Sequence, residues 1–408
     1  MSASNQFMVS ARATYVDANA ATLQWVLDRT ADGEGWLDTK LNSVTLKDYG
    51  AEDGLRGPEY VYGWIQGRGL EALATHAAFF ADEAPALSAA LDAAGRRLYG
   101  LLDTLQRRDG HSYFCYDTTM TPVYPDAVGM VQTQTKPAEI YTYSDAFVAK
   151  GLVMGAARYA PTNMPRHLAY LAAVIAAIED GRFQMDERQP LAAETAASQP
   201  ADFGPRMILL GAAGPLVQLG LGQQARFADR FITDVLDGHF DADTGLLRNI
   251  AGEDACNVGH AIEFVGFALD YLPTDARPEL IGTLQRILIA SFRAGFIEPG
   301  IALSISIQSG EPLNPYCPWW SLPETIRAAA LCFARTGDAE IMAIWQQAHT
   351  AFFETFWRGA PPIAYQTMTK TGPVDFVPAT PDLDPGYHTG LSLLAAIRVA
   401  DSSTQAAR

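Results

Sequence analysis

The stretch Asn257-Val258-Gly259-His260-Ala261-Ile262-Glu263 places a histidine and a glutamate three residues apart at the start of an apolar segment. Side chains at positions i and i+3 of an α-helix lie on one face, so His260 and Glu263 are predicted to be neighbours. Asn257 is a residue type that caps helix N-termini, and the apolar run 264–272 fits a buried helix. The stretch therefore predicts a buried helix whose first turn presents a titratable pair.

A second histidine has a matching context near the C-terminal end of the sequence. Pro385-Gly386-Tyr387-His388 opens another apolar segment, Leu391 to Val399. A single histidine at a helix end more often fills a polar niche in the structure. Two histidines at the starts of buried helices, in a chain with only 7, instead suggest a shared acid–base site.

The composition bounds the class of protein. The chain has 408 residues, 49% of them hydrophobic, and no linker-like tract, so one catalytic domain over residues 1–408 is expected. A formal charge of −17 argues against nucleic acid or an anionic membrane as a partner. Because we find neither a signal-peptide pattern nor a membrane-length apolar run, we expect a cytoplasmic protein. The 4 cysteines form no C-x-x-C pair, so we expect reduced thiols.

Helical periodicity dominates the sequence and predicts twelve helices of two alternating kinds. One kind is apolar and rich in small residues, and the other carries charge along one face. Such pairs fit two concentric rings, so the predicted fold is an all-α (α/α)6 barrel, with an open helical solenoid as the alternative. The buried set is predicted to begin near residues 59, 140, 205, 257, 319 and 387, and the half-exposed set near 18, 84, 164, 223, 275 and 339.

Irregular segments precede each predicted buried helix. In a barrel they would gather at one end, where loops on a rigid scaffold commonly carry function. The alternating segment Ser112 to Tyr116 predicts a strand, and we expect short β-hairpins within these loops. The irregular segments are residues 30–58, 110–139, 181–204, 239–255, 296–318 and 358–386.

The first turns of the buried helices would line one site below these loops. Aromatic faces pack on sugar rings, while charged and amide groups bond sugar hydroxyls, so the candidates favour a carbohydrate ligand. Taken singly, each residue also has a structural explanation, such as a core tryptophan or an internal ion pair. Their joint placement is the stronger evidence. The candidates are Tyr62, Arg68, Tyr143, Asp145, Arg206, His260, Glu263, Trp319, Trp320, Glu324 and His388.

Four segments occur in an order typical of a known family: Gln66-Gly67-Arg68, Gly259-His260-Ala261-Ile262-Glu263, Pro318-Trp319-Trp320 with Glu324, and Tyr387-His388. In these segments the chain resembles the N-acylglucosamine 2-epimerase superfamily, which includes cellobiose 2-epimerases and mannose isomerases. The resemblance implies an (α/α)6 barrel that interconverts sugars without metal or cofactor. It also implies that His260 and His388 are the acid–base pair, that Arg68 and Glu263 hold the substrate or tune a histidine, and that the tryptophans form the sugar platform.

The sequence departs from this family in two places. Members usually carry a histidine-bearing segment at the third buried helix, where this chain has Gly204-Pro205-Arg206-Met207-Ile208-Leu209-Leu210-Gly211. Leu322-Pro323 also replaces the glutamine usual after the tryptophan pair. Arg206 at the changed position suggests a carboxylate, sulfonate or phosphate on the substrate. The alternative is an ion pair with a nearby acid such as Asp202.

If the resemblance holds, a histidine removes the C2 proton of an open-chain aldose to give a cis-enediolate. Imidazole suits this step because its usual pKa of about 6.5 lies near working pH, and Arg68 would stabilise the enediolate oxygen. Return of the proton to C2 gives the 2-epimer and return to C1 gives the ketose. The sequence leaves both outcomes open, and the missing third histidine favours the isomerase.

Two other classes of function remain as alternatives. A glycoside or unsaturated-uronyl hydrolase would need paired carboxylates, for which Glu263, Glu324 and Asp145 are candidates. An inactive sugar-binding protein is the second alternative. The histidines lack metal-ligand spacing, so no metal site is predicted. A small-molecule sugar is the expected partner, and a homodimer is left open.

Overall fold

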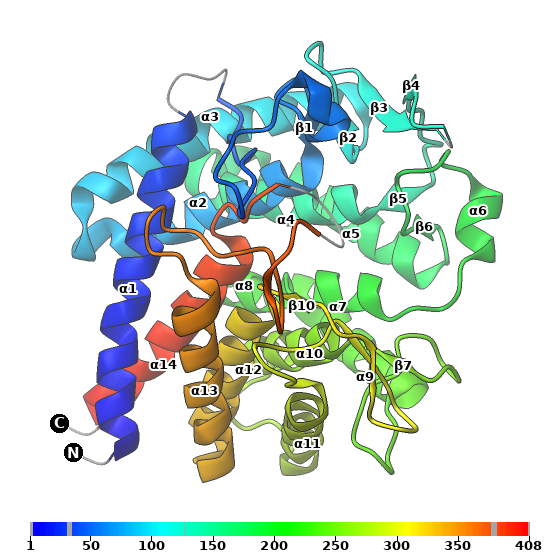
Figure 1. Ribbon diagram of the computed structural model, residues 1–408. Helices are drawn as coiled ribbons and strands as arrows, with labels where there is room; N and C mark the ends of the chain where they lie inside the picture. Colours follow the sequence, from blue (N-terminus) through cyan, green and yellow to red (C-terminus); the bar gives the residue numbers. More distant parts are fainter. Residues whose placement is uncertain (1–2, 31–34, 127, 377–381, 407–408) are drawn as a thin grey trace.

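The computed structural model describes residues 3–30, 35–126, 128–376 and 382–406, and helices dominate it (Figure 1). Fourteen α-helices occur in these ranges, and thirteen of them occupy the twelve predicted positions. The predicted helix 205–219 is divided into α7 (Gly204–Leu210) and α8 (Ala213–Gln218), and α6 (Ala193–Ser198) is additional. Pro215 explains the division, since a proline fits only the first turn of a helix.

The helices form an inner and an outer set, as the alternation of apolar and half-charged segments predicts. The outer helices are α1 (Ala3–Thr30), α3 (Pro85–Asp109), α5 (Met164–Glu179), α9 (Phe227–His239), α11 (Pro278–Gly295) and α13 (Ala339–Ala351). The inner ones are α2 (Gly63–Glu83), α4 (Tyr143–Tyr159), α7 with α8, α10 (Val258–Tyr271), α12 (Ser321–Thr336) and α14 (Ser392–Ala406), the last entered through the π-helical turn η5 (Tyr387–Leu391).

The inner helices contact one another in a closed cycle. Helix α2 packs on α4, α4 on α7, α7 and α8 on α10, α10 on α12, and α12 on α14, while η5 returns to α2. Outer helices cover this ring: α3 packs on α2 and α4, α11 on α10 and α12, and α1 on α14 (Figure 1). This order of contacts confirms the predicted (α/α)6 barrel and excludes an open solenoid.

Burial explains which helix lies inside. Residues of α10 from Val258 to Leu269 are buried except for His260, so this helix packs on every side. Outer α9 instead buries one stripe, with Phe227, Phe231 and Val235 inward and charged residues outward. Within the described part of the chain, we find no helix long and apolar enough to cross a membrane.

Short strands tie together the loops that lead into the inner helices. Antiparallel strands β1 to β4 join the loops before α2 and α4, and parallel β5 and β6 join those before α4 and α7. Strands β7 to β9 and β10 to β12 link the later loops in the same way. The predicted gathering of loops at one end is therefore observed. The strands are β1 (Val61–Tyr62), β2 (Cys115–Tyr116), β3 (Pro122–Pro125), β4 (Val131–Thr133), β5 (Tyr141–Thr142), β6 (Phe183–Gln184), β7 (Ala255–Cys256), β8 (Ser304–Ser306), β9 (Pro312–Asn314), β10 (Cys317–Pro318), β11 (Thr367–Thr369) and β12 (Gly372–Pro373).

Some predicted boundaries are wrong. Helix α1 begins at Ala3 rather than near Ala18, because the sparse apolar residues Met8, Ala11 and Tyr15 form a buried stripe. Helix α2 begins at Gly63 rather than near residue 59, because β1 occupies the preceding residues. The remaining short helical segments are η1 (Ala51–Arg56), η2 (Pro161–Asn163), η3 (Gln224–Arg226) and the π-helical η4 (Phe352–Phe356).

Candidate active site

His388 lies in a turn that the side chain of Asp384 holds in place. The Asp384 carboxylate accepts hydrogen bonds from the backbone N–H groups of Tyr387, His388 and Thr389, at 2.9, 3.1 and 2.9 Å. Gly386 enters the turn with φ of 88°, a conformation that glycine adopts without strain. Asp384 therefore satisfies the free amides at the start of η5 and holds the His388 backbone in place.

Two glutamates from neighbouring inner helices face the imidazole of His388. Its Nδ1 lies 3.0 Å from Glu324 Oε1 of α12 and 3.8 Å from Glu263 Oε1 of α10. Arg327, one turn along α12, lies 3.1 Å from the other oxygen of Glu324. All four side chains are buried. The i, i+3 pair that the sequence predicts in α10 thus contributes Glu263 to this group.

The electrostatics of the two glutamates differ. Burial, together with the charge of Glu324, raises the pKa of Glu263 to about 8. Burial also disfavours the charged form of Glu324, but Arg327 and the bond to His388 more than offset it, so the pKa of Glu324 lies below its usual value. Burial lowers the pKa of His388, and Glu324 opposes that shift. At neutral pH the group therefore combines an ionised Glu324, a protonated Glu263 and a neutral His388.

The rings of His260 and His388 both lie beside the ring of Trp320. The Trp320 ring centroid is 5.5 Å from that of His260 and 5.7 Å from that of His388, with interplanar angles of 33° and 35°. Gly259 permits this contact, since a Cβ there would lie 2.4 Å from the Trp320 ring. The G-H-x-x-E and W-W segments of the sequence are thus in direct contact. Both His260 and Trp320 are half-buried.

The backbone of His260 is fixed, but its ring is not held by a partner. Asn257 caps α10 by accepting a hydrogen bond from the His260 amide at 3.2 Å, as the sequence predicts. Burial of the ring, with His388 and Arg68 nearby, lowers the pKa of His260 to about 4. Its Nδ1 has no hydrogen-bond partner among the described residues. His260 is therefore a neutral imidazole with unused hydrogen-bonding capacity.

Arg68 of α2 completes the group from the opposite side of the ring of helices. Its guanidinium carbon lies 4.0 Å from the Phe147 ring centroid and 5.5 Å from those of Trp64 and Tyr387. We find no carboxylate within ion-pair distance of it in the residues described, and its Nε is unpartnered. The internal ion pair considered for Arg68 is therefore not observed. A buried cation in an aromatic cage is suited to bind a ligand oxygen.

Glu263, Glu324 and His388 together have the donor set of a metal site, although Arg327 and a proton on Glu263 compete with a metal ion. One oxygen from each of Glu263 and Glu324 and a nitrogen of His388 lie within 4.8 Å of one another, a set that could ligate Zn²⁺. Arg327 already neutralises Glu324, and the pKa of Glu263 near 8 leaves this ligand protonated at neutral pH. A metal ion at this position would therefore have to displace the Glu263 proton and compete with Arg327 for Glu324.

Not every predicted residue joins the group. Trp319 is buried, with its ring edge toward His388 at 6.2 Å between centroids, so it packs beside the site. Tyr143 is half-buried, and its ring makes an edge contact with Trp64. Tyr62 is buried beneath Lys40, and its hydroxyl donates to Leu55 O at 2.8 Å. The structure gives Tyr62 a packing role and keeps it apart from the histidines.

Arg206 also lies away from the predicted site. Its Nε is 3.3 Å from Asp234 Oδ2 on the outer helix α9, and its guanidinium lies over Phe231. The structure does not bring Arg206 together with the histidines, and the alternative, an ion pair with a nearby acid, is observed with Asp234 rather than Asp202. Met207 and Ile208, the neighbouring residues of α7, are buried apolar side chains. Helix α7 supplies neither a histidine nor a carboxylate in place of the missing histidine.

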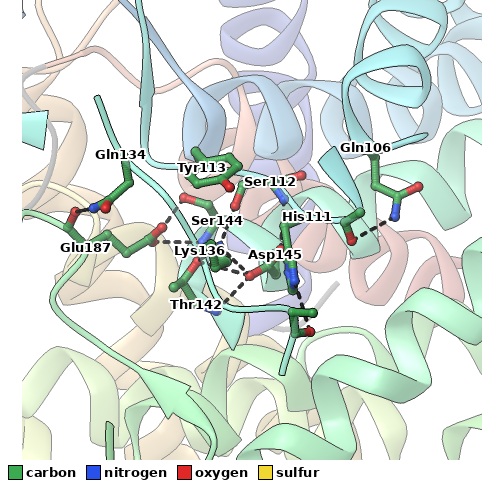
Figure 2. A network of polar contacts seen from close by, with 12 residues as sticks. Gln106, His111, Ser112, Tyr113, Gln134, Lys136, Thr142, Ser144, Asp145 and Glu187 are labelled. Atoms are coloured by element: carbon green, nitrogen blue, oxygen red, sulfur yellow. Dashed lines mark hydrogen bonds and ion pairs between the residues drawn. The ribbon is translucent and has the colours of Figure 1, made fainter. Parts of the chain in front are cut away.

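Asp145 belongs to a separate polar network, shown in Figure 2. Its carboxylate accepts hydrogen bonds from Lys136 Nζ at 2.7 Å, Tyr170 OH at 2.6 Å and the Ser112 amide at 2.8 Å. The nearby Lys136 lowers the pKa of Asp145 despite complete burial. Saturated with donors, Asp145 is unsuited to the catalytic role considered for a hydrolase.

Sequence reasoning missed three residues that support the site. Arg327 follows Glu324 at i+3, and Asp384 precedes the helix start at 387, so both had a local signal. Glu187 had none: it comes from the loop after β6 and accepts hydrogen bonds from Trp64 Nε1 at 2.7 Å and the Ser144 amide at 2.9 Å. It thereby holds Trp64 against Arg68.

Comparison with solved structures establishes the fold. The chain is similar to a sugar epimerase from a ruminal bacterium, at 14% identity over 94% of this chain and 98% of that one, with a TM-score of 0.70. It is also similar to cellobiose 2-epimerase from Bacillus thermoamylovorans B4167 (15% identity, 94% and 99% covered, TM-score 0.68). The third is a D-mannose isomerase (12% identity, 95% and 97% covered, TM-score 0.68). No family model matches the chain, and no curated protein matches its sequence.

Proposed function

We propose that the protein is a sugar isomerase or 2-epimerase of the N-acylglucosamine 2-epimerase superfamily, acting on an aldose through a cis-enediolate. The observation that carries the proposal is the pair of neutral histidines, His260 and His388, whose rings both lie beside one half-buried tryptophan, near a buried arginine that has no ion-pair partner among the described residues. The similar solved epimerases and isomerase support the same chemistry.

His388 is the base in this proposal. Glu324 accepts the Nδ1 proton, so the lone pair of Nε2 is free to take the proton from C2 of the open-chain sugar. The Arg68 guanidinium, which lacks a carboxylate partner in the described chain, stabilises the oxygen that becomes negative in the enediolate. Trp320 offers its face to the sugar ring, and the protonated Glu263 donates a hydrogen bond to a hydroxyl.

His260 assists ring opening in this scheme, because α7 has Met207 and Ile208 where members of the superfamily carry a histidine. With a pKa near 4, His260 is neutral at working pH and can accept the proton of the anomeric hydroxyl, while the bond from C1 to the ring oxygen breaks and that oxygen takes up a proton from water. A single base held by a carboxylate also favours proton return from the same face. We therefore expect the ketose rather than the 2-epimer as the main product.

The hydrolase alternative fits the geometry less well. Glycosidases separate their two carboxyl groups by at least about 5 Å so that they flank the scissile bond. Here Glu263 and Glu324 present oxygens within 4.8 Å of each other, and Glu324 is committed to Arg327 and His388. An inactive sugar-binding protein would share the tryptophan platform and differ only in turnover.

Product analysis tests the proposal. The protein is incubated with mannose, glucose, N-acetylglucosamine, cellobiose and a sugar acid, and the products are separated by anion-exchange chromatography. A ketose or a 2-epimer is the expected product for at least one aldose. Release of a monosaccharide from cellobiose would instead indicate a hydrolase. Binding of a sugar without formation of any product would support the alternative of an inactive sugar-binding protein.

A further inference from the structure

We propose that Arg327 is a positioning residue that fixes the tautomer of His388 by acting through Glu324. The geometry is a chain of three buried groups: Arg327 Nη1 lies 3.1 Å from Glu324 Oε2, and Glu324 Oε1 lies 3.0 Å from His388 Nδ1. The structural part of this proposal stands on these contacts. Its kinetic consequences rest on the proposed function.

The surroundings of Glu324 explain why it needs this cation. Glu263 of α10 faces the same imidazole nitrogen, at 3.8 Å from it, so two carboxyl groups share one buried site. Like charges in such a site favour protonation of one partner. Arg68 of α2 also faces Glu324, and Lys150 of α4 faces Glu263, but neither makes an ion pair with Glu324 in the residues described. Arg327 is the cation in contact, and it keeps Glu324 as the ionised partner.

Loss of the Arg327 charge would reverse the hydrogen bond. With Arg327 in place, Glu324 is an acceptor and the neutral ring of His388 carries its proton on Nδ1. Without that charge, Glu324 would hold a proton and donate it toward Nδ1. The ring proton would then lie on Nε2, and the lone pair that takes the C2 proton would no longer be available.

The test compares Arg327→Met and Arg327→Lys with a control on the same helix, Arg335→Met. Arg335 donates to the Leu269 and Leu272 carbonyls at the end of α10, so its loss removes structural hydrogen bonds without touching Glu324. Proteins labelled with ¹⁵N-histidine are examined by two-bond ¹H–¹⁵N correlation, with the His388 signals assigned from His388→Asn.

We expect the Nδ1–H form at neutral pH in the wild type, Arg327→Lys and Arg335→Met, and the Nε2–H form in Arg327→Met. In activity assays, Arg327→Met should lower kcat/KM at neutral pH by about 10²-fold, the lower range for loss of acid–base catalysis. The acidic limb of its pH profile should move to higher pH, because Glu324 without Arg327 deprotonates later. Arg327→Lys, which keeps the charge, should retain most of the wild-type kcat/KM and a nearly unchanged pH profile.

A folded Arg327→Met protein that keeps the Nδ1–H form would overturn the proposal. If that variant does not fold, Arg327→Gln makes the same test, since it keeps hydrogen-bonding capacity without charge. The spectra do not depend on turnover. A wild type without isomerase or 2-epimerase activity would therefore refute the proposed function while leaving the tautomer result to decide the role of Arg327.

Discussion

Two buried networks in this barrel combine a histidine, a carboxylate and a cation. One is His111, Asp145 and Lys136 (Figure 2), and the other is His388, Glu324 and Arg327. In the first, both ring nitrogens of His111 have partners: Nδ1 lies 3.3 Å from Asp145 Oδ1 and Nε2 lies 3.1 Å from Ala138 O. The carboxylate there is saturated with donors.

The second network is surrounded by unmet hydrogen-bonding capacity. Buried atoms without a hydrogen-bond partner in the described residues include Arg68 Nε, His260 Nδ1 and Glu263 Oε1. Because buried polar groups in folded proteins are nearly always satisfied, such a concentration of exceptions indicates a place for a polar ligand. The difference teaches that residue type alone does not identify a site, and that unsatisfied partners do.

Substituting the histidines should give the largest difference in kcat between the two networks. His388→Asn and His260→Asn should each lower kcat by about 10²–10⁴-fold, the range for acid–base catalysis, with little change in Tm. His111→Asn should leave kcat nearly unchanged and lower Tm. Steady-state kinetics and calorimetry on the three variants check this. Strong unfolding of His388→Asn would assign that residue to the core instead.

Breaking the Asp145 network should lower the free energy of unfolding strongly. Lys136→Met leaves Asp145 buried without its cation, and breaking a buried pair in this way costs about 3–5 kcal/mol. Urea unfolding measures the loss. The control is Arg188→Ala, which removes an exposed pair with Asp186 and should cost less than about 1 kcal/mol. Similar losses of unfolding free energy in both variants would contradict a stabilising role for the buried pair of Lys136 and Asp145.

Glu263 should make the site respond to alkaline pH. Its folded-state pKa, about 8, is raised above the usual 4.5, so its contribution to stability is present at low pH and is lost as pH rises through 8. The free energy of unfolding should fall by roughly 1 kcal/mol between pH 7 and 9 in the wild type, and by less in Glu263→Gln. Chemical denaturation at both pH values measures this, and equal falls in the two proteins would refute it.

Arg206 should give the smallest effect. Because it pairs with Asp234 on the outside of the barrel, Arg206→Ala should change unfolding free energy by no more than about 0.5 kcal/mol and leave KM for any substrate unchanged. A large rise in KM confined to anionic sugars would show instead that Arg206 binds the substrate.

The fold was largely predictable because inner and outer helices differ in composition along their whole length. The first turn of α10 was predictable too, since His260, Glu263 and Asn257 interact locally. The partnership of Glu324 with His388 was not, because it joins residues 64 apart through barrel closure. The side chain of Arg206 was misplaced because the phase of a helix as short as α7 depends on packing that periodicity does not record.

The measurement that tests the account most directly is hydrogen exchange at C2 of the substrate. The protein and an aldose that it converts are incubated in D₂O, and the C1 and C2 signals are followed by NMR. Abstraction by His388 predicts deuterium in the product, at C1 if it is the ketose or at C2 if it is the 2-epimer, and no incorporation with His388→Asn. Conversion without any deuterium in a large excess of D₂O, or undiminished incorporation by His388→Asn, would contradict proton transfer through this histidine.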